Sequence, residues 1–165
     1  MGTVDNMPRA NAILSNPIFV RELERINDLE KDRIFCGHGM EHLLDVARIA
    51  HILNLESKDS LFPKELIYAA ALLHDIGRAR QYDDGTPHEI ESARLSESIL
   101  PKCGFSENES KLILDAILSH RTASRGEKSR FSEYLYRSDK LSRRCRDCAG
   151  FEQCDWKLKN MQLVY

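Results

Sequence analysis

The sequence lacks the features that mark membrane, secreted or nucleic-acid-binding proteins. Its 165 residues include 24 Lys and Arg against 26 Asp and Glu, so it has no global basic field to attract nucleic acid. No apolar run approaches the length of a membrane span, and the first residues lack the basic-then-apolar layout of a signal peptide. We therefore expect no nucleic-acid partner, no membrane partner and a cytoplasmic location.

Cysteines are few, and their number is odd. Three of the five lie within the ten residues from Cys145 to Cys154. This distribution is not that of a secreted disulfide framework and favours a reducing compartment. The sequence also lacks a Gly-x-Ser-x-Gly nucleophile elbow, a glycine-rich phosphate loop, internal repeats and low-complexity tracts.

The apolar pattern predicts one all-α domain over residues 1–165. Residues 1–15 are weakly patterned and are expected to be loose or packed as an arm. The segments 83–85, 122–129 and 161–165 read as a turn, a loop and a short β-prone tail. Helices are expected over residues 17–32, 40–53, 63–77, 87–100, 107–120 and 131–142.

Several helix ends carry recognisable signals. Asn16-Pro17 combines a capping residue with proline at the first helical position. The segments Thr86–Glu89 and Ser106–Glu109 both read as capping boxes. Gly77 is expected to close the third helix as a C-cap.

The stretch Ala69–Arg78 is the centre of the predicted bundle. An alanine-rich helix, which neighbouring helices can approach closely, runs directly into His74-Asp75. Buried polar groups are costly when they lack partners, and a metal ion would satisfy both side chains. A buried hydrogen bond between His74 and Asp75 is the alternative.

Four further polar residues lie at positions where a buried polar side chain would need a partner. His42, His120 and Asp139 lie on the apolar stripes of three other predicted helices. His88 lies in the first turn of a helix, where we expect it at the mouth of the bundle and not deep inside. A single histidine on an apolar stripe is more often an ordinary core residue, but the combination favours a metal site.

The order His42, His74-Asp75, Asp139 resembles the HD-domain superfamily of metal-dependent phosphohydrolases. His88 and His120 look like the two extra histidines of the subgroup that binds two metals. The resemblance covers residues 30–143 and leaves residues 144–165 as a cysteine-rich C-terminal extension of the HD-domain helical bundle. The matching local contexts are Glu41-His42-Leu43-Leu44-Asp45-Val46-Ala47, Ala71-Leu72-Leu73-His74-Asp75-Ile76-Gly77 and Ser138-Asp139-Lys140-Leu141.

The resemblance implies a role for each residue. Asp75 would be the catalytic carboxylate that bridges two metals, and the first metal would be held by His42, His74, Asp75 and Asp139. His88 and His120 would hold the second metal. Imidazole and carboxylate ligands suit Mn, Fe, Co, Ni or Zn better than Ca or Mg. Two such ions can share a hydroxide that attacks a phosphoryl group.

The resemblance also implies a small phosphorylated substrate, and a nucleotide is the favoured class. Arg78 and Lys140 are the favoured phosphate-binding residues, while Arg80 and Arg121 are weaker candidates. Basic residues at helix ends are also stabilised by the helix dipole, so this placement alone does not prove a role. Arg78 departs from the lysine that many relatives have after His-Asp-x-Gly. The Gly-Tyr-Pro signature of the cyclic-di-GMP branch is absent after His120.

Two other functions fit the same six residues. The HD fold also includes diiron oxygenases, which use a similar ligand set. A third reading is a non-catalytic sensor of metal or nucleotide, with the cysteine-rich extension as its output. The sequence does not decide among these functions, and it leaves the native metal and the oligomeric state open.

The C-terminal extension contains a second candidate metal site. The spacing Cys145-x2-Cys148-x5-Cys154 could bind Zn or an iron–sulfur cluster. Such a site would normally need a fourth ligand, for which Cys36 and Cys103 are available. The alternative is three reduced thiols in a basic turn. The neighbouring arginines are expected to form a solvated patch: Arg143, Arg144 and Arg146.

Overall fold

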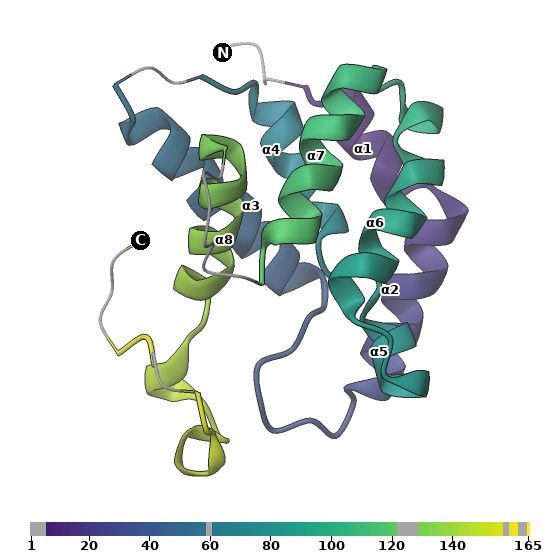
Figure 1. The fold of residues 1–165 in the computed structure, drawn as a ribbon. Coiled ribbons are helices and arrows are strands. Elements are labelled where there is room, and N and C mark those ends of the chain that lie inside the picture. The colour runs from purple at the N-terminus through teal and green to yellow at the C-terminus, as the bar shows by residue number, and fades with distance from the viewer. Residues whose placement is uncertain (1–5, 59–60, 122–128, 157–158, 162–164) are drawn as a thin grey trace.

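The computed structural model of the chain describes residues 6–58, 61–121, 129–156, 159–161 and 165, and within these residues it is helical without strands (Figure 1). The prediction of an all-α fold is confirmed. Residues 122–128 of the predicted loop and most of the predicted β-prone tail lie outside the described residues, while Ser129 caps the start of α8. The α-helices are α1 Pro8–Leu14, α2 Pro17–Leu29, α3 Met40–Glu56, α4 Lys64–Leu73, α5 Arg78–Asp84, α6 His88–Ile99, α7 Glu107–Ser119 and α8 Arg130–Leu141.

Helix α4 lies at the centre of the bundle. It packs against α1, α3, α7 and α8, and its alanines Ala69, Ala70 and Ala71 are at most 1% exposed. Small side chains let the surrounding helices approach closely, as the sequence predicts. None of the described helices is both long and apolar enough to cross a membrane.

Two of the three predicted N-terminal helix caps are confirmed. The Asn16 side chain accepts a hydrogen bond from the backbone N–H of Ile18 at 3.0 Å, and the capping box Ser106–Glu109 is formed in both directions. The box predicted at Thr86–Glu89 is wrong, because α6 begins at His88 without a side-chain cap. The Thr86 hydroxyl instead donates a hydrogen bond at 2.7 Å to the carboxylate of Asp84, two residues before it.

Gly77 is not the predicted helix C-cap. Helix α4 ends at Leu73, and Gly77 has a φ of −82°, outside the left-handed region that favours glycine. A Cβ atom at this position would lie 2.5 Å from the carbonyl oxygen of His88 and 2.5 Å from the nitrogen of Ser92. Glycine is therefore required here because the first turn of α6 crosses directly over it.

Two short helices were not expected from the sequence. Helix α1 is attached to the bundle by Arg9, whose guanidinium pairs with Glu65 at 2.7 Å and with Glu109 at 2.8 Å. Helix α5 follows Gly77 at once and packs against α2 and α6 (Figure 1). Both helices have seven residues, too few to produce a clear apolar period.

The C-terminal segment continues from α8 without a further α-helix in its described part. It contains the 3₁₀ turns η2 Cys145–Asp147 and η3 Phe151–Gln153, while a third such turn, η1 Pro101–Cys103, follows α6. In Figure 1 the segment lies below α8, at the same end of the molecule as the loop between α2 and α3. The division into a core at 30–143 and an extension at 144–165 stays a prediction.

Candidate metal centre

The Asp75 carboxylate lies at the centre of the site and is 1% exposed. Its Oδ2 atom lies 3.1 Å from Nε2 of His74 and 3.4 Å from Nε2 of His42. Its Oδ1 atom lies 3.1 Å from Nε2 of His88 and 3.8 Å from Nε2 of His120. The two oxygens of one carboxylate therefore face two different pairs of histidines.

Asp139 completes the group on the Oδ2 side. Its Oδ1 atom lies 3.4 Å from Nε2 of His42 and 3.9 Å from Nε2 of His74. Within each of two groups, the potential ligand atoms all lie within 4.8 Å of one another. The structure thus brings together all six side chains singled out in the sequence. The two groups are His42, His74, Asp75 and Asp139, and Asp75, His88 and His120.

These side chains come from the ends of five helices. These ends converge because α3, α6, α7 and α8 all pack against α4. His42 lies in the first turn of α3, His74 and Asp75 follow α4, His88 begins α6, His120 follows α7, and Asp139 lies in the last turn of α8.

Each histidine is oriented by a hydrogen bond through its Nδ1 atom. Nδ1 of His74 lies 2.7 Å from the carbonyl oxygen of Ala71, and Nδ1 of His120 lies 2.6 Å from that of Ile117. A carbonyl oxygen only accepts, so Nδ1 carries the proton and Nε2 presents its lone pair to the site. Histidine ligands of metals are usually held in this way.

The other two histidines follow the same pattern. Nδ1 of His88 lies 2.6 Å from Oε1 of Gln81. Nδ1 of His42 lies 3.2 Å from Oγ of Ser142, whose own proton goes to the carbonyl oxygen of Asp139 at 2.8 Å. All four Nε2 atoms therefore face the site, where those of His88 and His120 lie 3.1 Å apart.

Several buried atoms at the centre have no hydrogen-bond partner. They are Nε2 of His42, Nε2 of His74 and both carboxylate oxygens of Asp75. An unpaired buried polar atom costs about 1–3 kcal/mol, so four of them in contact would be strongly unfavourable without a compensating ligand. Divalent transition metals accept this mixture of imidazole and carboxylate donors, so the residues fit such an ion.

The two carboxylates of the site already carry the charge that metal ligands need. Burial raises the pKa of the Asp75 carboxyl, but His74 and His120 outweigh it and hold that pKa well below its usual value. Burial likewise acts against Asp139, yet His42 and Arg143 keep its pKa low. Ionised carboxylates are ready to bind a cation without first losing a proton.

His88 is buried more deeply than predicted. It does begin α6, but it is 1% exposed and does not lie at the mouth of the bundle. The close crossing of α6 over Gly77 draws the first turn of the helix inward, where Ser92 Oγ accepts a hydrogen bond from the Gly77 nitrogen at 2.9 Å. Burial lowers the pKa of His88.

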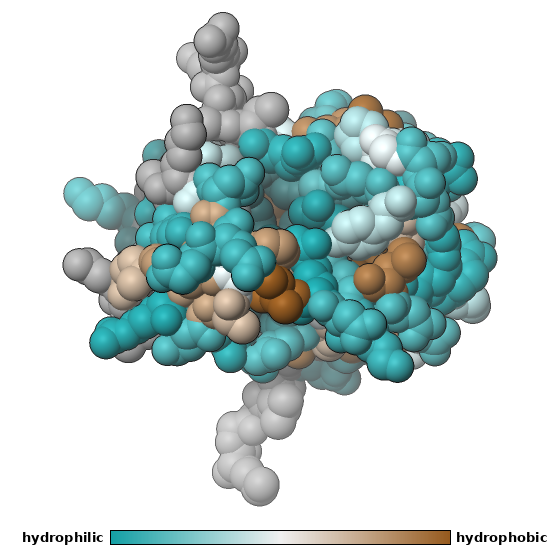
Figure 2. Space-filling model, turned by 90° about the horizontal axis from the view of Figure 1, so that it is seen from below, coloured by the Kyte–Doolittle hydropathy of each residue, from teal (hydrophilic) through white to brown (hydrophobic). Residues whose placement is uncertain are grey.

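A cavity of about 690 Å³ opens beside the two groups. Its wall includes three of the predicted phosphate-binding residues, Arg78, Arg121 and Lys140. Arg80 does not line the cavity and pairs with Asp84 at 2.7 Å. Figure 2 views the molecule from this end, where the surface is mostly hydrophilic with small apolar patches.

The basic residues of the cavity contact the site. Nε of Arg78 lies 3.4 Å from Oδ1 of Asp75. The Lys140 ammonium pairs with Asp139 and lies 5.4 Å and 5.2 Å from the ring centres of Tyr136 and Trp156. Both aromatic rings therefore lie at the cavity wall next to a cation.

His38 is a site residue that the sequence interpretation missed. Its backbone N–H donates to Oε2 of Glu30 at 2.7 Å, and its ring contacts the same carboxylate. Tyr82 donates to Glu30 at 2.5 Å. Burial lowers the pKa of His38 to about 4. The signal that could have found it is its place in the sequence just before α3, four residues ahead of His42, whose ring centre lies 5.8 Å away.

Arg143 was also missed, because it was expected in a solvated patch. It is 7% exposed, and its Nη2 atom donates to Oδ1 of Asp139 at 2.8 Å. Its Nη1 atom donates to the carbonyl oxygen of Gly37 at 3.4 Å. Arg144 and Arg146 are exposed, as predicted. The position of Arg143 one turn after Asp139 was the available signal.

The model of the HD domain matches residues 39–145, which is more than half of the chain. The chain belongs to the HD-domain family. HD domains bind divalent metals, and the two groups of side chains described above could hold such ions. The assignment of these histidine and aspartate side chains as metal ligands stays a prediction.

Three curated proteins are similar to this chain in sequence. A protein of Clostridium beijerinckii, described only as uncharacterized, is 44% identical over 162 residues, covering 96% of this chain and 100% of the relative. The bifunctional uridylyltransferase/uridylyl-removing enzyme of Nitrobacter hamburgensis is 36% identical over 67 residues, and that of Nitrobacter winogradskyi is 34% identical over 67 residues. These matches span 41% of this chain and only 7% of either enzyme.

A solved structure shares the fold. It is a predicted HD superfamily hydrolase from an uncultured Thermotogales bacterium, with a TM-score of 0.60 and 27% sequence identity. The match covers 75% of this chain and 65% of the solved chain. The chain thus spans about two thirds of that protein.

Proposed function

We propose that this HD-domain chain is a metal-dependent phosphohydrolase that cleaves a phosphate ester or phosphoanhydride, with a nucleotide as the substrate class. One observation carries the proposal. The two oxygens of Asp75 face separate histidine pairs, which is the arrangement expected of a carboxylate that bridges two ions. The similarity to a predicted HD superfamily hydrolase supports it.

The ligand set follows from the two groups. His42, His74, Asp75 and Asp139 would hold one ion, and Asp75, His88 and His120 the other. Bound divalent ions would supply a water molecule of lowered pKa and neutralise phosphoryl charge. The protein holds the four imidazole rings through their Nδ1 atoms, keeps the two carboxylates ionised and buries the centre away from bulk water.

The cavity wall supports a nucleotide as the substrate class. Arg78 and Lys140 lie next to the ligand groups, where their positive charges would bind phosphate oxygens. Tyr136 and Trp156 add flat aromatic surfaces further along the same wall, against which a nucleobase could stack.

The test is an activity screen of the full chain. The chain is loaded in turn with Mn, Fe, Co, Ni and Zn and given a generic phosphodiester, nucleoside mono-, di- and triphosphates, and dinucleoside polyphosphates. We expect phosphate or nucleotide release that requires the added metal. Arg78→Ala should raise KM, whereas Arg80→Ala should leave it unchanged, because Arg80 lies outside the cavity.

The same experiment separates the other two functions. A diiron oxygenase would consume oxygen with iron bound and release no phosphate. A sensor would bind a nucleotide without turnover. Either outcome, obtained with a chain that holds metal at the two histidine groups, would contradict the hydrolase proposal.

A further inference from the structure

The C-terminal segment has little apolar packing to hold its shape. None of its described residues after Arg143 belongs to the apolar clusters that form the core. All five cysteines are free thiols, so no disulfide fixes it. Short segments without a core usually depend on a metal or a disulfide for a defined structure.

Two turns of the same shape present cysteines from this segment. In η2 the nitrogen of Cys148 bonds to the carbonyl oxygen of Cys145 at 3.3 Å, and after η3 the nitrogen of Cys154 bonds to that of Phe151 at 3.3 Å. Cys148 and Cys154 also share one backbone conformation, with φ, ψ of −81°, 123° and −82°, 122°. Each tight turn thus ends on a thiol, and Cys-x2-Cys is a spacing used by metal sites.

Cys36 comes from the loop between α2 and α3 to the same place. The loop packs on the segment at Gly150, where a Cβ atom would lie 2.7 Å from the Phe35 ring. Sγ of Cys148 lies 4.0 Å from the carbonyl oxygen of Ile34. Figure 1 shows the loop and the C-terminal segment at the same end of the molecule.

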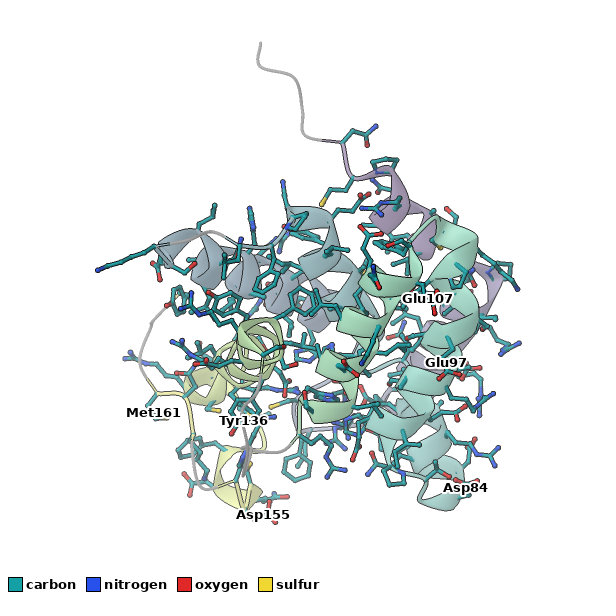
Figure 3. The ribbon with its side chains drawn as sticks, turned by 45° about the horizontal axis from the view of Figure 1, so that its top comes forward. Asp84, Glu97, Glu107, Tyr136, Asp155 and Met161 are labelled. Carbon is teal, nitrogen blue, oxygen red and sulfur yellow. The ribbon has the colours of Figure 1, made fainter. Side chains whose placement is uncertain are left out.

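The cavities place Cys36 between the two turns. Cys36 and Cys148 both line a cavity of about 510 Å³. Cys36 and Cys154 both line the cavity of about 690 Å³. In Figure 3, Asp155, the neighbour of Cys154, lies on the same side of the molecule as Tyr136 of α8, which lines the second cavity.

Without a cation, the surroundings of Cys36 disfavour its thiolate. Burial raises the pKa of the Cys36 thiol, and the charge of Arg143 opposes this effect. Cys148 and Cys145 add to the rise, which places both thiols within electrostatic range of Cys36. A cluster of thiolates would gain from a cation, and the buried guanidinium of Arg143 already compensates part of the charge.

Cys103 is excluded as the fourth ligand. It is buried in the main apolar cluster after α6, together with Phe105. Burial raises its pKa, and its polar neighbour is Asn16 at the start of α2. Of the two thiols that the sequence offers beside the extension, only Cys36 lies with it.

We propose that Cys36, Cys145, Cys148 and Cys154 form a tetrathiolate metal centre, separate from the two histidine groups. The centre would join the α2–α3 loop to the C-terminal segment and supply the cohesion that this segment lacks. Its ligand is a thiophilic metal, either an iron–sulfur cluster or a single zinc ion.

Among the described residues, no three thiols are gathered closely enough for one zinc ion. In the described residues, the groups whose ligand atoms lie within 4.8 Å of one another contain no cysteine. Thiolates around one zinc ion would lie about 3.8 Å apart, since the Zn–S distance is about 2.3 Å. Thiolates that each bind a different iron of a cluster lie further apart.

The test is the metal content of the full chain purified without oxygen. We expect iron with acid-labile sulfide and a visible absorption band, or one zinc ion per chain that thiol reagents release. Cys36→Ser and Cys148→Ser should each lose this metal, whereas Cys103→Ser, the matched control, should keep it. His74→Ala should lose metal from the histidine groups and keep the thiolate-bound metal.

A second measurement covers variants that fail to fold. The parent chain, stripped of metal without oxygen and given either Co²⁺ or iron with sulfide, should show the strong sulfur-to-metal charge-transfer absorption of thiolate ligation in one of the two cases. Absence of this band with both additions, or unchanged metal content in Cys36→Ser and Cys148→Ser, would overturn the proposal. Because the readout is thiolate-bound metal and not turnover, its failure is distinguishable from failure of the hydrolase proposal.

Discussion

At the scale of single residues, the site depends on how one carboxylate divides its two oxygens. Asp75 cannot satisfy either oxygen with a protein hydrogen bond, although both are buried. Its negative charge can be compensated by bound cations, and each of its oxygens faces a different pair of imidazoles. Asp75 should therefore matter more than any one histidine.

Replacing Asp75 by Asn tests this point. The change keeps the size but removes the negative charge, so metal affinity should fall by more than about 100-fold, since residues that merely support ligands already contribute about 10–100-fold. Phosphohydrolase activity should disappear while circular dichroism stays helical. Titration with Mn and an activity assay provide the measurement. Normal metal binding and turnover in Asp75→Asn would make Asp75 a structural carboxylate.

His88→Ala and His120→Ala test the number of ions. Each variant should lower the bound metal from two ions per chain to one. Of the two oxygens of Asp75, these imidazoles lie next to Oδ1 and not next to Oδ2. Metal analysis after equilibration with excess Mn gives the count. His51→Ala is the control, since this histidine of α3 lies outside both groups. Unchanged stoichiometry in both variants would leave a mononuclear site.

The sequence predicted which side chains come together but not how deeply they are buried. Order and position in the sequence singled out the six side chains that meet, because each stands at a helix end or on an apolar stripe. The burial of His88 depends on how α6 crosses over Gly77, which no local pattern records. The same holds for His38, whose partner Glu30 lies across a loop.

At the scale of elements, the crossing of α6 over the turn after α4 sets the distance between the two halves of the site. Gly77 makes that crossing close, and Ser92 fixes it with a hydrogen bond. The sequence predicted the six longer helices, but the short α1 and α5 and the early end of α4 were not predicted. These boundaries are decided by tertiary packing, since Gly77 looks like an ordinary helix stop.

Gly77→Ala should displace α6 and weaken the second group of ligands. Overpacking of this kind costs about 1–3 kcal/mol, and metal bound by His88 and His120 should be lost first. Gly85→Ala is the matched control: Gly85 has a φ of 82° with open space around it, so the change strains the backbone without moving α6. Denaturant unfolding and metal analysis of both variants check this. Equal metal loss in both would contradict the proposed role of the crossing.

The loop after α2 should make the protein sensitive to acid through Glu30. Burial raises the pKa of Glu30, but bonds from His38 and Tyr82 lower it to about 2 from its usual 4.5. A lowered carboxyl pKa stabilises the folded state above pH 4.5, and this stabilisation is lost as the pH falls toward 2. The loss should be about 1–2 kcal/mol, allowing for partial solvent screening.

Urea unfolding of the parent and of Glu30→Gln between pH 6 and pH 3 measures this effect. The variant should lose less stability on acidification than the parent. Glu107→Gln serves as the control, because Glu107 is an exposed residue at the start of α7, far from the loop (Figure 3). Parallel pH profiles for the parent and Glu30→Gln would contradict the prediction.

At the scale of the whole molecule, five helix ends meet at one point, so metal binding should stabilise the entire bundle. A ligand present at 100 times its Kd adds about 2.7 kcal/mol to the free energy of unfolding. For a chain of this size, that corresponds to a rise in Tm of about 5–10 °C. Thermal unfolding with excess Mn and with a chelator should show this difference. In Asp75→Asn the difference should vanish, and its persistence there would place the stabilising metal elsewhere.

The burial of Arg143 also has a consequence for the approach of substrate. Arg143 and Lys140 pair with Asp139, so their positive charges offset the negative charges of Asp75 and Asp139 before any ion is bound. Divalent ions would then leave a local excess of positive charge in a low-dielectric cavity. Such a field draws polyanions in from solution, so association of a phosphorylated substrate should slow as ionic strength rises.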